Sequence, residues 1–276
     1  MLPSAKTMIP APLSLIVALS LGTASCGVEF EPRTTLSGYR MVGIEANPPE
    51  TTPEGIVELR AHDFYDGGEP LRYSWSVCPR GLGAAHDYAC AVPQLEASLG
   101  SDPAATLDLG PNGLDLRRLL AEAGPSFAGD GSLQTLERGV DVWVRLTSGP
   151  DCSECKAITT VKRIVVREGE LSPNQNPTIE QFEVIGPSVA EASVKLRVTV
   201  STPEVFFDVN TGKEETEDYL YTWYTTGGET NPGSTSGDEQ ETELALPAEP
   251  GSIQVMVAVR DGRGGFALEE RQIVVE

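Results

Sequence analysis

The sequence predicts an all-β protein that contains two β-sandwiches in tandem. Three observations lead to this fold class. The chain shows the same order of hydrophobic signals twice. The segments within each copy alternate apolar and polar residues with a period of two, which is typical of half-buried strands. Clusters of Pro and Gly separate these segments, and several short strands divided by turns indicate antiparallel sheets packed face to face.

An apolar run from Leu13 to Leu21 lies near the start of the chain, after a single charged residue, Lys6. The run is too short to span a bilayer as a mature helix, but it has the length of a signal-peptide core. It is followed by Thr23-Ala24-Ser25-Cys26, which resembles the lipobox of bacterial lipoproteins, with Thr at the place where Leu is usual. We therefore expect residues 1–25 to be a lipoprotein signal peptide.

The lipobox resemblance implies that Cys26 becomes the mature N-terminus and carries lipid, a diacylglycerol with commonly a further acyl chain such as palmitate. Two or more acyl chains hold a domain on a membrane essentially permanently. Gly27 stands where an inner-membrane retention signal would place Asp, so the resemblance implies the outer membrane, on its periplasmic or cell-surface side. Cleavage after Ala24-Ser25 by an ordinary signal peptidase, which would give a secreted protein, stays open.

The chain is strongly acidic. Its formal net charge is −21 at pH 7, and loss of Lys6 with the signal peptide makes it one unit more negative. Such a surface repels phosphate backbones and anionic lipid heads, which excludes nucleic acid as an expected partner. The length of the mature chain, residues 26–276, favours two domains.

The strand signals of the two copies correspond in order. The matching pairs are Val57–Arg60 with Val194–Arg197, Tyr73-Ser74-Trp75 with Tyr221-Thr222-Trp223, Val140–Leu146 with Ile253–Val259, and Arg163–Val166 with Gln272–Val275. Because side chains alternate between the faces of a strand, Trp75 and Trp223 are expected in the two cores. By the same parity, Tyr224 lies on an outer face and Trp143 points away from the apolar face of its strand.

We expect the chain to be divided into a tether over residues 26–37, a first sandwich over 38–168 with an insertion over 79–135, a linker over 169–177 and a second sandwich over 178–276. The linker is polar, contains Pro and shows no periodicity. Within the insertion, Leu116, Leu119, Leu120 and Ala123 recur at helical spacing and stop before Gly124. This spacing predicts one short helix that caps the first sandwich.

The two Tyr-x-Trp strands, the Pro-rich segment Ala46–Glu50 and the segment Val257–Gly265 resemble the Ig-like and PKD-like modules of bacterial surface proteins. The resemblance covers residues 38–276. It implies tandem Ig-like β-sandwich domains that serve as structural, adhesive or protein-interaction modules.

Four cysteines remain once Cys26 is assigned to lipid, and an even number in an exported chain indicates disulfides. The strands that precede Cys78 and Cys152 are expected to be antiparallel neighbours, which places these two cysteines at opposite ends of a sheet. The expected bonds are therefore Cys78–Cys90 and Cys152–Cys155. The second pair has the spacing of a redox dithiol, but its place at a hairpin tip, without a following helix, favours a structural bond.

The sequence shows no constellation that predicts an enzyme. Neither His62 nor His86 adjoins a nucleophile or zinc motif. Asp208, Asn210 and Glu214 are candidate Ca²⁺ ligands in an acidic loop, but their spacing departs from the EF-hand pattern, and a solvated loop is the preferred interpretation. No cofactor is expected.

Two function hypotheses follow. The first is a non-catalytic, lipid-anchored cell-envelope protein whose Ig-like modules act in structure, adhesion or protein interaction. The second is a carbohydrate-binding or substrate-capturing surface lipoprotein, which depends on outward-facing Tyr224 and Trp143. Either hypothesis gives the membrane as a partner through the lipid, together with a protein or a glycan of the envelope.

Overall fold

The computed structural model describes most of the chain after residue 32. The described residues are 33–79, 81–82, 84–86, 88–123, 136–169, 172–208 and 211–276. The chain divides into a unit over residues 1–31 and a compact unit over residues 32–276. The expected signal peptide and Cys26 lie outside the described residues. Within the described part, no helix is long and apolar enough to cross a membrane.

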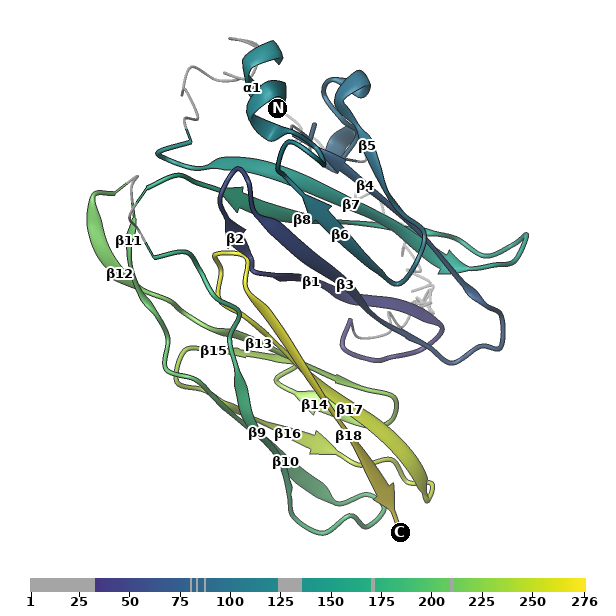
Figure 1. Ribbon diagram of the computed structural model, residues 1–276. Helices are drawn as coiled ribbons and strands as arrows, with labels where there is room; N and C mark the ends of the chain where they lie inside the picture. Colours follow the sequence, from purple (N-terminus) through teal and green to yellow (C-terminus); the bar gives the residue numbers. More distant parts are fainter. Residues whose placement is uncertain are drawn as a thin grey trace, which may run out of the picture. The chain divides into compact units, whose positions relative to one another are not determined.

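The first half of the compact unit contains two facing sheets (Figure 1). One sheet has the order β1 (Tyr39–Asn47), β3 (Ile56–Tyr65), β6 (Ala104–Asp108). The other has the order β2 (Glu50–Thr51), β8 (Ile158–Val166), β7 (Val140–Pro150), β4 (Leu71–Cys78), β5 (Ala97–Gly100). All pairs are antiparallel except β2 with β8. This division into A-B-E and C-F-G strands is that of an Ig-like sandwich.

The second half repeats the arrangement. One sheet has the order β14 (Glu229–Asn231), β16 (Glu241–Ala245), β10 (Ser193–Val200), β9 (Ile179–Ile185). The other has the order β15 (Ser234–Ser236), β13 (Leu220–Thr225), β17 (Gly251–Arg260), β18 (Phe266–Val275). A separate two-stranded hairpin is formed by β11 (Val205–Asp208) and β12 (Lys213–Thr216). The protein is therefore all-β, with two Ig-like sandwiches in tandem.

Each sandwich has its own apolar core, and each core contains the tryptophan predicted from strand parity. Trp75 is 1% exposed and Trp223 is fully buried. The indole N–H of Trp75 donates to the carbonyl of Asp102 at 2.7 Å, and that of Trp223 donates to Thr235 Oγ1 at 3.1 Å. Both large side chains are thus buried without an unpaired donor, which burial of a polar group requires.

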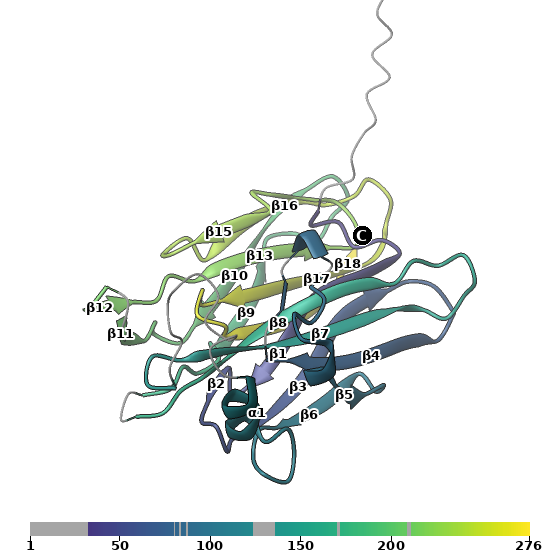
Figure 2. The ribbon, with the colours of Figure 1, turned by 90° about the horizontal axis from the view of Figure 1, so that it is seen from above.

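The predicted short helix is present as α1 (Leu116–Ala123), at one end of the first sandwich after β6 (Figure 2). Leu116 and Leu119 are buried, and Leu116 belongs to the first core. Two 3₁₀ turns, η1 (Ala84–His86) and η2 (Pro93–Leu95), precede β5. Strands β5 and β6 lie within the segment expected as an insertion, residues 79–135, and both pair within the sandwich sheets. Their short, small-residue sequences carry little periodicity from which a strand could be predicted.

The predicted disulfides are confirmed. Cys78 is bonded to Cys90 and Cys152 to Cys155, with Cα–Cα distances of 5.5 Å and 5.2 Å. Strands β4 and β7 are antiparallel neighbours, with Leu71 opposite Pro150 at one end and Cys78 opposite Trp143 at the other. This register separates Cys78 from the hairpin tip that carries Cys152, so a bond between these two cysteines is excluded.

Candidate functional site

A buried carboxylate lies where the first sandwich, the linker and the second sandwich meet. Glu50, on β2, is 5% exposed. Its Oε1 accepts hydrogen bonds from Arg167, whose Nε is 2.7 Å away. Its Oε2 accepts from the backbone N–H of Asn174 at 3.1 Å, and Arg263 Nη2 lies 3.5 Å from the same oxygen. We call this region, where residues of the two sandwiches and the linker meet, the junction. A buried charge is costly unless it is paired, and Glu50 is paired from three separate segments.

Arg263 connects Glu50 to acidic residues of the second sandwich. Its Nη1 lies 2.9 Å from Glu217 Oε1 and 3.5 Å from Glu204 Oε2. Its guanidinium also covers the ring of Phe206, with the Cζ 4.1 Å from the ring centroid, a favourable cation–π distance. Burial raises the pKa of Glu217 above its ordinary value, and the charge of Arg263 acts in the opposite direction. The guanidinium of Arg263 thus pairs with carboxylates of both sandwiches.

Asp261 organises the turn that carries Arg263. Its Oδ1 accepts from the backbone N–H groups of Arg263, Gly264 and Gly265 at 2.8, 2.9 and 2.7 Å. Its Oδ2 accepts from Asn174 Nδ2 at 2.8 Å. A Cβ at position 265 would lie 2.1 Å from that Oδ2, so only glycine fits there. The turn between β17 and β18 is thereby fixed in shape and tied to the linker.

The junction also has an apolar part. Its buried members come from the segment before β1 and from strands of both sandwiches, namely Leu36, Val42, Met256, Ala258 and Phe266. A Cβ on Gly43 would lie 2.5 Å from the ring of Phe266, so this glycine allows the ring to reach β1. Removal of this apolar surface from water stabilises the contact in proportion to its area.

Polar side chains on both sides of the junction bond to backbone groups across it. Asn176 of the linker donates its Nδ2 to the carbonyl of Ala46 at 2.8 Å and accepts from the N–H of Phe266 at 2.9 Å. Arg260 Nη2 donates to the carbonyl of Val42 at 2.7 Å. The two sandwiches are therefore joined by directional bonds as well as by apolar packing.

Lys162, on β8, donates a hydrogen bond to the carbonyl of Gly264 in the turn of the second sandwich. Burial lowers the pKa of Lys162 from its ordinary 10.5 to about 8. The carboxylates of Asp261 and Glu45 act in the opposite direction, but they do not offset the loss of solvation. Lys162 is a junction group whose charge changes just above neutral pH.

His62 lies within β3 and contacts the junction. Its Nε2 is 2.8 Å from Glu45 Oε2, and its ring centroid is 5.3 Å from that of Phe266. The hydrogen bond from His62 lowers the pKa of Glu45 below its ordinary value, and the nearby charges of Arg60 and Lys162 add to the effect. His86 lies in η1 and is exposed.

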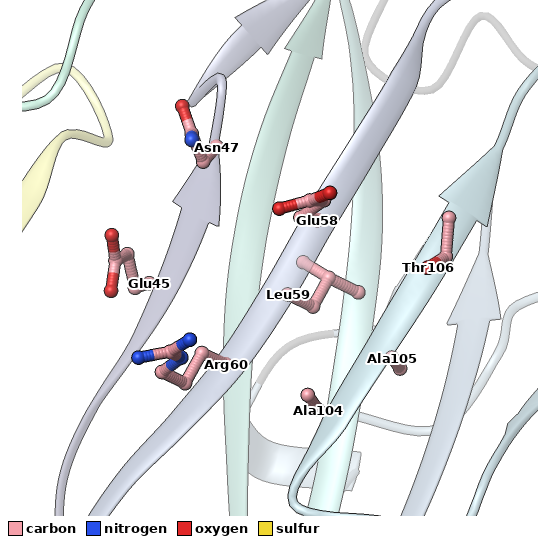
Figure 3. A pocket seen from close by; sticks show the side chains of 8 residues that line it. All are labelled: Glu45, Asn47, Glu58, Leu59, Arg60, Ala104, Ala105 and Thr106. Atoms are coloured by element: carbon pink, nitrogen blue, oxygen red, sulfur yellow. The ribbon is translucent and has the colours of Figure 1, made fainter.

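A shallow polar groove of about 410 Å³ lies on the outer face of the sheet β1-β3-β6 (Figure 3). Glu45 and Asn47 from β1 and Glu58 and Arg60 from β3 line it, in a register that places Glu45 opposite Arg60. Figure 3 shows the guanidinium of Arg60 extending toward Glu45. Thr106 closes the groove from β6. Its lining is charged and contains no aromatic ring, so it offers hydrogen bonds and ion pairs rather than stacking.

Tyr224 and Trp143, the two aromatics predicted to face outward, lie in different places. Tyr224 is on the outer face of its own sandwich, but it is partly buried against the apolar part of the junction. Trp143 is partly buried, and a Cβ on Gly81 would lie 3.4 Å from its Cγ. The loop closed by Cys78–Cys90 therefore covers part of the indole. The two rings are not brought together.

The candidate Ca²⁺ ligands belong to the hairpin β11–β12. Asp208 ends β11 and Glu214 lies in β12, while Asn210 falls outside the described residues. Among the residues that the structure describes, no group of three or more His, Cys, Asp or Glu side chains could hold a metal ion. The most buried acid of this region, Glu217, faces Arg263 instead.

Sequence reasoning missed the polar residues of the junction, Glu50, Arg167, Asn174, Asp261 and Arg263. The sequence did contain a signal, because the Pro-rich segment at residues 46–50 and the Gly-rich turn at 261–265 contain three of them. By themselves, both segments indicate only an Ig-like module. Nothing local indicates that segments so distant in sequence meet.

No protein-family model and no curated protein matches the chain. Among solved structures, the D0-D1 domain of intimin is similar, with 12% identity over 85% of this chain and 98% of that chain and a TM-score of 0.23. The D00-D0 domain of intimin has 8% identity over 87% and 98%, with a TM-score of 0.27. The fibronectin(III)-like modules of Clostridium thermocellum CbhA have 11% identity over 85% and 94%, with a TM-score of 0.24. Because these scores are low, the fold assignment rests on the strand order.

Replacing Glu50 by Gln should destabilise the protein by about 3 kcal/mol, because it leaves the largely buried guanidinium of Arg167 without its counter-charge. The free energy of unfolding from denaturant titration measures this effect. Glu54→Gln is the matched control, since the Glu54–Arg117 pair is about half exposed and such pairs contribute little. Equal, small effects of the two substitutions would contradict the assigned role of Glu50.

Stability should rise with pH through the titration of Lys162. The folded-state pKa of about 8 lies below the ordinary 10.5, so between these values the unfolded chain binds the proton more strongly. Raising the pH from about 7.5 to about 10 should therefore stabilise the wild type by about 2 kcal/mol relative to Lys162→Met. Denaturant midpoints at both pH values measure the difference. Parallel pH profiles of the two proteins would show that Lys162 is not buried in this way.

Proposed function

We propose that the chain is a non-catalytic, lipid-anchored protein of the bacterial cell envelope, whose two Ig-like sandwiches act together as a structural or protein-interaction module. The junction is the observation that carries this proposal. Buried charges, backbone hydrogen bonds and an apolar cluster connect the two sandwiches. A flexible string of domains does not need such contacts, since relative motion is the default unless an interface is specific and well packed.

The junction suits a module that holds its surfaces at a fixed spacing. Many of its polar groups have partners with a defined direction, as the three bonds to Asp261 Oδ1 illustrate. Hydrogen bonds to charged groups are strong and angle-dependent. The exposed faces of both sandwiches would then be presented as one surface, which favours attachment of a protein partner at several points.

The proposed anchor is Cys26, modified with lipid and followed by Gly27, which favours the outer membrane. The chain is already bound to the second sandwich soon afterwards, because Leu36 N–H donates to the carbonyl of Thr225 at 2.7 Å. Thr225 N–H donates in turn to the carbonyl of Thr34 at 3.0 Å. The segment from Cys26 to Thr34, if fully extended, reaches roughly 30 Å at most. The lipid would therefore hold the module close to the membrane.

A protein partner is favoured over a glycan. The glycan hypothesis depended on Tyr224 and Trp143 offering exposed rings for stacking. Tyr224 packs against the junction and Trp143 is partly covered by its neighbouring loop. The polar groove of Figure 3 has no aromatic ring among its lining residues.

Radiolabelled palmitate and protease shaving of intact cells test the anchor and its orientation. The wild type should incorporate label, and Cys26→Ser should not. Cys152 and Cys155 are bonded to each other, so a Cys152→Ser/Cys155→Ser variant is the control and should still be labelled. Cleavage on whole cells would place the module at the cell surface, and full protection would place it in the periplasm. Absence of label in the wild type would contradict the lipid anchor and indicate a secreted protein.

A further inference from the structure

The hairpin β11–β12 presents an apolar face that the described residues leave partly open to solvent. Val205 is 67% exposed and Phe207 is 45% exposed. Because alternate residues share a face, these two side chains point the same way, beside Thr216 and Glu214 on the partner strand. Two large apolar side chains next to each other on a projecting strand are uncommon on a surface that faces only water.

The hairpin is held firmly at its base. Phe206, on the opposite face, packs under the guanidinium of Arg263. Glu217 N–H donates to the carbonyl of Glu204 at 3.0 Å, and Glu204 N–H donates to Glu217 Oε2 at 3.1 Å. The same arginine belongs to the junction, so the exposed face is fixed relative to the buried network. The exposure of Val205 and Phe207 therefore follows from the contacts that hold the base of the hairpin.

The hairpin also has open edges. In the described part of the chain, β11 and β12 pair only with each other and join neither sandwich sheet. A strand with unpaired backbone N–H and C=O groups can accept another strand by main-chain hydrogen bonding. A hairpin of two strands alone is only marginally stable in water, and a third strand increases its stability.

The charge around this face selects the kind of partner. Residues 204–218 contain one lysine, Lys213, and six acids, of which Glu204 and Glu217 pair with Arg263; the other four are Asp208, Glu214, Glu215 and Asp218. A second copy of this chain carries the same negative charge and would be repelled, and so would an anionic lipid surface. A partner with positive charge and alternating apolar side chains is complementary.

We propose that the apolar face of β11–β12, formed by Val205, Phe207, Thr216 and Glu214, is a docking site for an extended, basic segment of another protein. The segment adds as a third strand. Its apolar side chains pack beside Val205 and Phe207, and its lysine or arginine side chains point to the opposite face, which carries Glu215 of β12. This inference rests on the proposed interaction role and names the partner chemistry, but binding by the purified protein tests it independently of the lipid anchor.

A short peptide that alternates lysine and valine serves as the probe, labelled for fluorescence anisotropy against the purified protein. An otherwise identical peptide of glutamate and valine is the charge control. The wild type should bind the lysine peptide and not the glutamate peptide. Equal binding of the two peptides, or no binding of the lysine peptide, would overturn the proposal.

The variant Val205→Ser/Phe207→Ser retains every charge of the hairpin and should weaken binding of the lysine peptide by about tenfold or more, since the buried apolar contact is lost. Val274→Ser is the matched control, because Val274 is 65% exposed on β18, and it should bind as the wild type does. Equal binding by all three proteins would show non-specific attraction to an acidic surface and would overturn the proposal.

Hydrogen exchange supplies a second measurement that does not depend on a variant. The lysine peptide should slow exchange of backbone amides in β11 or β12, where a third strand would pair. Protection elsewhere with none in the hairpin would place the peptide at another surface and overturn the proposal. If binding and protection are found but palmitate labelling fails, the docking site stands and only the lipid anchor is wrong.

Discussion

The burial of the Glu50 carboxylate is the constraint on which the arrangement of this protein depends. An ionised group out of water must be surrounded by donors, and the described structure supplies them from Arg167 after β8, Asn174 in the linker and Arg263 in the second sandwich. No single segment can satisfy the carboxylate. The two sandwiches and the linker must therefore come together in one geometry, because other arrangements would leave buried charge unpaired.

Stability and arrangement have different physical sources in this molecule. The two apolar cores, around Trp75 and Trp223, supply the non-directional stabilisation of each sandwich. The junction adds groups whose bonds have direction, and it is there that the relation between the sandwiches is specified. Arg263 connects the junction to the hairpin β11–β12. It pairs with Glu50 and packs on Phe206 of the hairpin. The proposed docking face is thus connected to the buried network by one side chain.

Local patterns in the sequence predicted the local structure well. Period-two alternation placed Trp75 and Trp223 in the cores, helical spacing predicted α1, and the strand register led to the disulfide pairing, all of which the structure confirms. Parity tells which face of a strand a side chain occupies, but not what covers that face. For this reason Tyr224 was placed on the correct face and still interpreted as a binding residue, although it packs against the junction. The residues that bond to Glu50 are far apart in sequence and leave no periodic signal, so the junction could not be predicted.

We infer that the junction couples the two sandwiches into one cooperative structure. Differential scanning calorimetry of the wild-type protein tests it most directly, because two domains without a stabilising contact unfold independently. Coupled sandwiches should give one transition, with a calorimetric enthalpy equal to the van't Hoff enthalpy. Two resolved transitions, or a calorimetric enthalpy about twice the van't Hoff value, would show that each sandwich unfolds alone and would contradict the coupling through Glu50.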